Sequence, residues 1–185
     1  GIVCSDWDLI NEDDDLIGTR IFSVKSLLPG LEYLDRTIRT GRSCVACSGA
    51  MVRRSALADI RFNETGSIGF EDFVVWFRIA EAADVGHINR RLWRYRLHRR
   101  SASRGTVLRM ARHYRASLVR YCEEYVNRQP RYASRVAKWR ASTDRYLFWA
   151  LLYEVGLHVR SGRSAASGPS LQKTAFELTD YPLPP

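Results

Sequence analysis

The order of apolar and polar residues along the chain predicts alternating strands and helices over roughly its first hundred residues. An apolar run predicts a buried strand over residues 1–5, and a second strand is predicted over residues 20–24. Between them, the acidic residues 9–18 are expected to form a solvated loop. Helical spacing then predicts a helix over residues 31–40, which ends at Gly41.

The middle of the chain predicts further strands around one strong helix. Residues 44–52 are mostly small or apolar and include a predicted strand, and Ser55 is the candidate N-cap of a short helix after it. Apolar residues recur at helical spacing from Glu71 onward, which predicts the strong helix. Residues 85–89 and 92–97 are predicted as two strands, and basic and apolar residues alternate in the second.

Past residue 105 the pattern becomes purely helical. An amphipathic helix is predicted from Val107 to Tyr125 with Pro130 beyond it, and a second helix over residues 132–159. The residues that follow are small, polar and rich in proline, which is typical of a flexible tail. The predicted parts are an α/β domain at 1–105, a helical extension at 106–160 and a flexible tail at 161–185.

Composition supports a folded protein that does not span a membrane. The chain has 185 residues, of which 45% are hydrophobic and 11% aromatic, so it can bury a core and is not expected to be disordered. Its longest apolar run, residues 146–155, is shorter than a membrane span and is interrupted by Glu154. Because the chain begins inside a predicted strand, we expect an upstream part of the domain to be missing.

The four cysteines are expected to be buried or half-buried thiols in a reduced, cytoplasmic protein. The pair Cys44 and Cys47 has the spacing of a zinc or redox motif. A zinc site needs two more ligands, and the sequence has no second such pair and no matching histidine motif.

Charge is divided unevenly between the two halves of the chain. Residues 1–84 hold 9 Lys and Arg against 14 Asp and Glu, whereas residues 85–185 hold 20 against 6. An acidic front and a basic back suit a metal site that meets a polyphosphate. They equally suit a basic surface that meets anionic lipid or nucleic acid.

Two acidic clusters are the candidate chemistry. Asp6 and Asp8 follow directly on the first predicted strand, at the edge of an α/β sheet where ligands usually bind, and paired carboxylates suit Mg²⁺ or Mn²⁺. Glu71 and Asp72 open a predicted helix, whose dipole keeps a carboxylate ionised and able to act as a base. Taken alone, each cluster is equally explained as an acidic strand edge or a helix cap.

Five segments follow one another in a characteristic order. They are Ser5-Asp6-Trp7-Asp8, residues 48–54, Phe62-Asn63-Glu64, residues 71–78, and Tyr95-Arg96-Leu97-His98 with Ser101 and Ser103. In this order they resemble the second half of a family 2 glycosyltransferase with the GT-A fold. The resemblance covers residues 1–105 and implies an incomplete GT-A, Rossmann-like mixed sheet with flanking helices, followed by the helical extension.

The resemblance implies a role for each matching position. Asp6 would approach the donor ribose or the metal, Asp8 would bind the cation that bridges the donor diphosphate, and Asp72 would be the general base. Glu71 would help to shape the acceptor site, and His98 would be a further metal or diphosphate contact. The remaining implied contacts form a mobile loop over the diphosphate: Arg96, Arg99, Arg100, Ser101 and Ser103.

The implied reaction is a single displacement with inversion at the anomeric carbon, dependent on Mn²⁺ or Mg²⁺. A nucleotide-sugar donor and a glycan, lipid-linked or protein acceptor would be the substrates, in bacterial glycan or polysaccharide synthesis. The signature Gln-x-x-Arg-Trp of processive synthases is missing, which favours a non-processive enzyme. Since the nucleotide-binding half of the family is not matched, the isolated chain is expected to be inactive.

The basic C-terminal half leaves two other interpretations open. Arginines and aromatics interleave over residues 109–145, as in nucleic-acid-binding helices, but the arginines are scattered and no known motif is present, so no nucleic acid is expected. The helices could instead dock on a membrane surface or a partner, which would place a cytoplasmic protein peripherally at the inner face of the membrane. A third reading is that they simply cover the sheet with solvated arginines.

Overall fold

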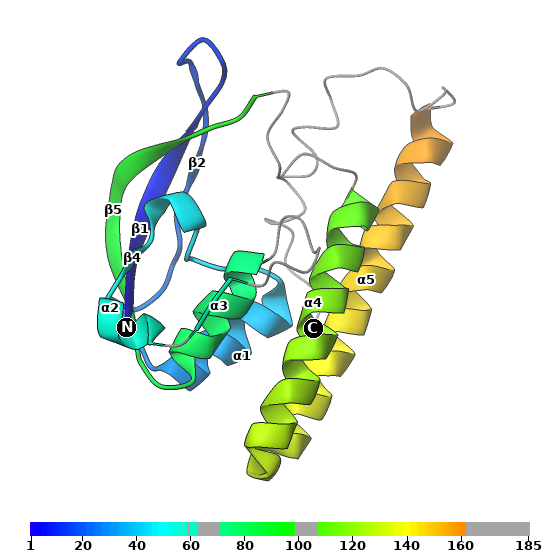
Figure 1. Cartoon of the computed structure of the whole chain (residues 1–185). Helices are drawn as coiled ribbons and strands as arrows, with labels where there is room; N and C mark the ends of the chain where they lie inside the picture. Colours follow the sequence, from blue (N-terminus) through cyan, green and yellow to red (C-terminus); the bar gives the residue numbers. More distant parts are fainter. Residues whose placement is uncertain (59, 63–70, 99–106, 162–185) are drawn as a thin grey trace. The chain divides into compact units, whose positions relative to one another are not determined.

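The computed structural model describes residues 1–58, 60–62, 71–98 and 107–161, which belong to two compact units. The first, called the sheet unit, holds the described residues up to 98 apart from residues 38–41. The second, called the helical unit, holds residues 38–41 and the described residues from 107 onward. Figure 1 shows the strands of the sheet unit and the two long helices of the helical unit.

A mixed sheet is the centre of the sheet unit. The strand order is β2-β1-β5-β3, and β4 also pairs with β1. Strands β1 and β5 are parallel, whereas the other pairs are antiparallel. The predicted α/β class with a mixed sheet is therefore confirmed at this coarse level. The strands are β1 (Ile2–Ile10), β2 (Leu16–Arg20), β3 (Leu27–Leu28), β4 (Met51–Val52) and β5 (Val85–Arg96).

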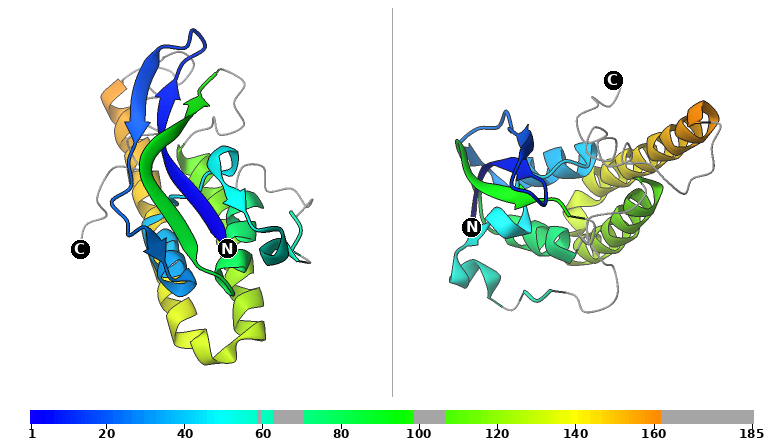
Figure 2. Two further views of the ribbon diagram at one scale, coloured as in Figure 1. Left: turned by 90° about the vertical axis from the view of Figure 1, so that its left-hand side faces the viewer. Right: turned by 90° about the horizontal axis from the view of Figure 1, so that it is seen from above.

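Two helices cover one face of this sheet, as the two views of Figure 2 show. They are α1 (Gly30–Thr40) and α3 (Glu71–Ala80), and the rings of Tyr33 and Phe77, one from each helix, lie 6.4 Å apart. The apolar positions that repeat at helical spacing in both segments are mostly buried. Burial of this stripe is the main stabilising contribution to the unit.

The opposite face of the sheet carries a row of exposed apolar side chains. Val3 pairs with Met51 on one side and with Gly86 on the other, and Gly86 pairs in turn with Leu27, so these positions share a face. Val3, Leu27 and Met51 are all exposed, whereas Ile2 and Cys4, which alternate with Val3, are buried.

The helical unit is an antiparallel helix hairpin. It consists of α4 (Val107–Arg128), the short 3₁₀ helix η2 (Pro130–Tyr132) and α5 (Ala133–Ser161). Pro130 stands just past the end of α4, where its missing N–H and fixed φ favour a break in the helix. At the turn, the ring of Tyr125 stacks on Tyr132 at 5.7 Å and lies 5.5 Å from Trp139. No helix in the described residues is long and apolar enough to cross a membrane.

The predicted long helices are confirmed, and four local predictions are wrong. The acidic loop is shorter than residues 9–18, because β1 runs on to Ile10 and β2 begins at Leu16. Asn11 closes this turn by accepting hydrogen bonds from the backbone N–H groups of Asp13 and Asp15. The second strand is consequently β2 rather than residues 20–24.

The other two wrong predictions concern β5 and the helix after β4. One continuous strand replaces the two predicted at 85–89 and 92–97, because a bulge lets the chain pass through the polar residues between them. The helix α2 (Arg54–Leu57) starts one residue before the predicted cap Ser55, and its N-cap, Arg53, makes no side-chain capping bond. Gly41 ends α1 with a φ of 67°, as its position after the helix predicts.

Candidate functional site

Asp6 lies where the register between β1 and β5 changes. Ser5 pairs with Ile88, but Asp6 pairs with Arg91, so Asn89 and Arg90 have no partner on β1. Bulges of this kind re-aim side chains next to functional sites. The bulge sets two arginines and an asparagine beside the first carboxylate of the acidic cluster.

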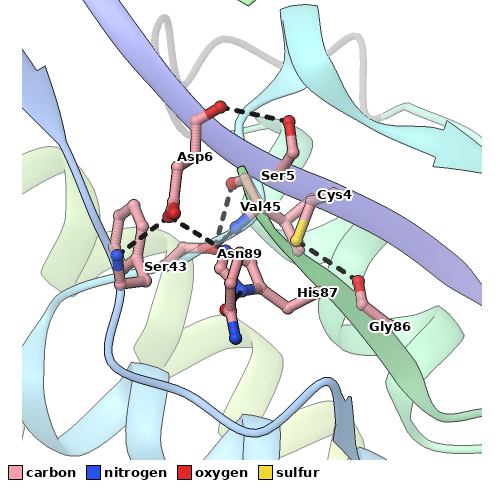
Figure 3. Close-up of polar contacts among 9 residues, drawn as sticks. Cys4, Ser5, Asp6, Ser43, Val45, Gly86, His87 and Asn89 are labelled. Carbon is pink, nitrogen blue, oxygen red and sulfur yellow. Dashed lines mark hydrogen bonds and ion pairs between the residues drawn. The ribbon is translucent and has the colours of Figure 1, made fainter. Parts of the chain in front are cut away.

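The Asp6 carboxylate is buried and held by two partners. The residue is 3% exposed, and its Oδ1 accepts a 2.9 Å hydrogen bond from the backbone N–H of Phe22. Nε2 of His87 lies 3.2 Å from the same oxygen, in a close contact that does not meet the geometry of a hydrogen bond. Figure 3 shows Asp6 and His87 facing each other from neighbouring strands.

His87 is in turn oriented by Asn89. Its Nδ1 lies 2.7 Å from Oδ1 of Asn89, and its ring lies edge-on to Phe22 with centroids 6.2 Å apart. The side chain of His87 is fully buried. A chain of contacts thus runs from the bulge residue Asn89 through His87 to the Asp6 carboxylate.

Asp8 and Arg96 are also engaged within the sheet unit. Oδ1 of Asp8 accepts a 2.9 Å hydrogen bond from Arg91, and the Asp8 side chain is 22% exposed. The guanidinium of Arg96 is an ion-pair partner of Asp14 and donates to the carbonyl groups of Asn11 and Glu12. Arg96 therefore contacts the β1–β2 turn.

A pocket of about 500 Å³ opens beside Asp6. The segment after β2 forms one wall and the β5 bulge forms the other, so one acidic and two basic residues border the same space. Arg90 is exposed at this pocket. The lining residues are Asp6, Ile21, Phe22, Ser23, Val24, Asn89, Arg90 and Arg91.

Asp72 lies in the first turn of α3, next to the 3₁₀ helix η1 (Cys47–Gly49). Its Oδ1 accepts a 3.0 Å hydrogen bond from the N–H of Phe73. Partial burial raises the pKa of the Cys47 thiol, and the nearby Asp72 carboxylate raises that pKa further. The carboxylate and the thiol are thus neighbours in space, although 25 positions separate them in the sequence.

The η1 helix is itself packed against the sheet. Gly49 lies directly on the indole ring of Trp93, and a Cβ at this position would overlap ring atoms. Trp93 in turn contacts Trp7, with ring centroids 4.9 Å apart. Trp7 stands between the two aspartates of β1, so packing links the Asp72 region to the strand that carries Asp6 and Asp8.

The structure does not bring His98 to the two aspartates. Asp8 pairs with Arg94, and His98 lies four residues further along the chain, two residues past the end of β5. In the part of the chain that the structure describes, no three His, Cys, Asp or Glu side chains form a group able to hold a metal ion. Outside the described residues lie the Glu71 side chain, Arg99, Arg100, Ser101 and Ser103.

The cysteines are free thiols in different environments. Cys4, Cys44 and Cys122 are buried as expected, but Cys47 is exposed, so that part of the prediction is wrong. The hydrogen bond between Cys4 and Cys44 raises the pKa of Cys4 and lowers that of Cys44. Burial raises the pKa of Cys122 to about 12.

The sequence predicted Asp6 and Asp8 as site residues but missed their partners His87, Asn89 and Arg91. A histidine two positions after Val85 in a predicted strand was the available signal, since residues at that spacing share a face and Val85 is apolar. Comparisons of the chain with protein-family models, with curated proteins and with solved structures gave no match.

Proposed function

We propose that this chain contributes to an inverting, non-processive glycosyltransferase of the family 2 type, which moves a sugar from a nucleotide-diphosphate donor to an acceptor hydroxyl. The observation that carries the proposal is the pocket beside Asp6, which lies in the middle of β1 rather than at its carboxyl end as the sequence predicted, and Arg90 and Arg91 of the β5 bulge border the same space. A donor of this class carries both hydroxyl groups and phosphates, and the pocket offers a partner for each.

Asp6 suits recognition of a hydroxyl group. Phe22 N–H and His87 hold its Oδ1, and within the described residues no hydrogen bond to Oδ2 is formed. A fixed carboxylate with one remaining oxygen can accept a hydrogen bond from a ribose hydroxyl. The orientation set by His87 gives this interaction its geometry.

Arg90 and Arg91 suit recognition of the diphosphate. Guanidinium groups bind phosphate oxygens through paired hydrogen bonds, and Arg90 is exposed at the pocket. Arg91 is bound to Asp8, so an incoming diphosphate would compete with that carboxylate for Arg91. Release of Asp8 in this exchange would free its oxygens for a cation.

The donor set fits a hard divalent cation. Asp6 and Asp8 offer carboxylate oxygens two positions apart on one strand, and Mg²⁺ is commonly held by one or two carboxylates together with substrate phosphates. Bound there, Mn²⁺ or Mg²⁺ would neutralise charge that develops on the leaving diphosphate. His98, the third ligand that the resemblance implies, lies two residues past the end of β5, and among the described residues it forms no three-ligand group with Asp6 and Asp8.

Asp72 is proposed as the general base. Its carboxylate would take the proton of the acceptor hydroxyl while the acceptor oxygen bonds to the anomeric carbon. The bond from that carbon to the diphosphate oxygen breaks, and the nucleoside diphosphate leaves with the electron pair. The position of Asp72 in the first turn of α3 favours its ionised form.

Nucleotide binding tests the proposal without knowledge of the sugar or the acceptor. Titration calorimetry of the full-length protein with uridine, guanosine and thymidine diphosphates, with and without Mn²⁺, is expected to give metal-dependent binding to one of them. Asp6→Ala and Asp8→Asn should each weaken that binding at least about tenfold, by loss of one charged hydrogen bond or one metal ligand. Asp13→Asn, an exposed acid in the β1–β2 turn, is the matched control. Equal binding by all three variants would contradict the assignment.

A further inference from the structure

The helical unit carries an exposed apolar face on the second half of α5. Four large side chains lie on it: Phe148 (55% exposed), Trp149 (40%), Leu151 (43%) and Leu152 (43%). Large apolar side chains gathered in this way commonly mark an interaction surface. We call these four residues the α5 apolar face.

The contact with α4 is made by other side chains of α5. Ala150 is buried against Ala111 of α4, and Tyr146 and Tyr153 pack on the same cluster. Positions 146, 150 and 153 follow the helical spacing of one side, whereas 148, 151 and 152 fall on the other. The α5 apolar face is therefore additional to the surface that holds the hairpin together.

Cations continue the apolar face along the helix. Lys138, Arg145 and Leu152 are seven residues apart in succession, which places them along one stripe of α5, and Lys138 and Arg145 are exposed. Asp144, four residues before Phe148, is paired with Arg115 of α4, whose Nε lies 2.6 Å from its Oδ1. Residues 107–161, which form these helices, hold 11 Arg and Lys against 4 Asp and Glu.

The cations and apolar side chains together indicate which kind of partner fits the α5 apolar face. A second copy of the chain, paired in parallel about a two-fold axis along α5, would bring the same cations of both copies close together, and they would repel. An anionic bilayer is complementary in both respects, because its headgroups attract Lys and Arg while its acyl boundary receives apolar side chains. Tryptophan also favours the interface between lipid and water.

We propose that the α5 apolar face, together with Lys138 and Arg145, binds the surface of an anionic phospholipid membrane. The helix would lie along the surface, with its apolar side chains at the acyl boundary and its cations among the lipid phosphates. This docking goes beyond the proposed sugar transfer, since it uses the helical unit alone and needs no donor or acceptor.

Vesicle sedimentation of the full chain tests the proposal. Binding is expected with vesicles of phosphatidylcholine and phosphatidylglycerol, and much less with phosphatidylcholine alone. The double variant Lys138→Gln/Arg145→Gln should lower the partition coefficient roughly 30-fold, from about 1 kcal/mol per cation at the surface. Phe148→Glu/Leu152→Glu should abolish sedimentation with the vesicles.

Two controls keep the result clear. Leu16→Glu replaces an exposed apolar residue on β2 and should sediment like the parent protein. Far-UV circular dichroism should match the parent for each variant, as expected of exposed positions. Equal binding by parent and Phe148→Glu/Leu152→Glu overturns the proposal, as does equal binding to both vesicle types.

Failure of the full chain to bind anionic vesicles also overturns it. If sedimentation velocity then shows a dimer that Phe148→Glu/Leu152→Glu dissociates, a second copy occupies the face. Neither readout involves sugar transfer, so these outcomes are independent of whether the glycosyltransferase proposal holds.

Discussion

Nε2 of His87 lies 3.2 Å from Oδ1 of Asp6, and both side chains are buried on adjacent parallel strands. A buried carboxylate is costly unless polar groups contact it. Here the His87 imidazole and the backbone N–H of Phe22 both lie against Oδ1 of Asp6. The same contacts fix the direction of the second oxygen. Stability of the sheet and geometry of the candidate site therefore depend on one pair of residues.

Replacing His87 by alanine should destabilise the sheet unit strongly. The change leaves the Asp6 carboxylate buried with one partner fewer, and we expect a loss of about 2–4 kcal/mol in the free energy of unfolding. Urea denaturation followed by tryptophan fluorescence measures it. Arg90→Ala, at the exposed side of the same pocket, should change stability by less than about 0.5 kcal/mol. A similar change in the free energy of unfolding for both variants would show that the His87 contact does not stabilise the sheet unit.

The neighbourhood of Asp72 and Cys47 predicts a change in thiol reactivity. The Asp72 carboxylate is one cause of the raised pKa of Cys47, so Asp72→Asn should lower that pKa and increase the thiolate fraction at pH 8. A rise of about two- to fivefold in the rate of reaction with an aromatic disulfide reagent is expected, since the thiol is partly exposed and the interaction is screened. The effect should vanish well above the thiol pKa, where the parent is also ionised.

The reaction rate reports on the Cys47 thiol, because the other three cysteines are buried. Cys47→Ser identifies the reacting group, and Asp13→Asn should leave the rate unchanged. An unchanged rate in Asp72→Asn would contradict the placement of α3 beside η1.

Close packing of Gly49 on Trp93 predicts that this glycine tolerates no side chain. Gly49→Ala would drive a methyl group into the indole ring and should cost about 1–3 kcal/mol in the free energy of unfolding. Gly18→Ala is the matched control, because a Cβ there meets only the Leu9 side chain, at 3.4 Å or more. Chemical denaturation measures the free energy of unfolding of both variants. Equal values would mean that η1 is not packed on the sheet.

The helices of this protein could be predicted because their information is local. The apolar stripes of α3 and α4 are complete within each segment, and Gly41 and Pro130 mark boundaries that the structure keeps. The extent of β1 was harder to predict, because the acidic turn hides the apolar pairs Leu9-Ile10 and Leu16-Ile17 that flank it. A single asparagine side chain closes that turn, which periodicity does not reveal.

The candidate site could be predicted only in part, for a related reason. Asp6 and Asp8 stand out in the sequence, but the partners of Asp6 come from register between strands that lie some 80 residues apart. The bulge that brings Arg91 to Asp6 breaks the alternation of β5, and this break was interpreted as a gap between two strands. Pairing over such separations depends on tertiary packing rather than on local preference.

Sugar transfer by the full-length protein tests the central claim most directly. With Mn²⁺, an acceptor extract and a panel of nucleotide sugars, the parent should release a nucleoside diphosphate, measured by a coupled assay. Asp72→Asn should lower kcat about 10²–10⁴-fold with donor affinity nearly unchanged, because only the proton acceptor is lost. Chelation of the cation should abolish turnover. Parent-like turnover by Asp72→Asn, or full activity in chelator, would contradict the account.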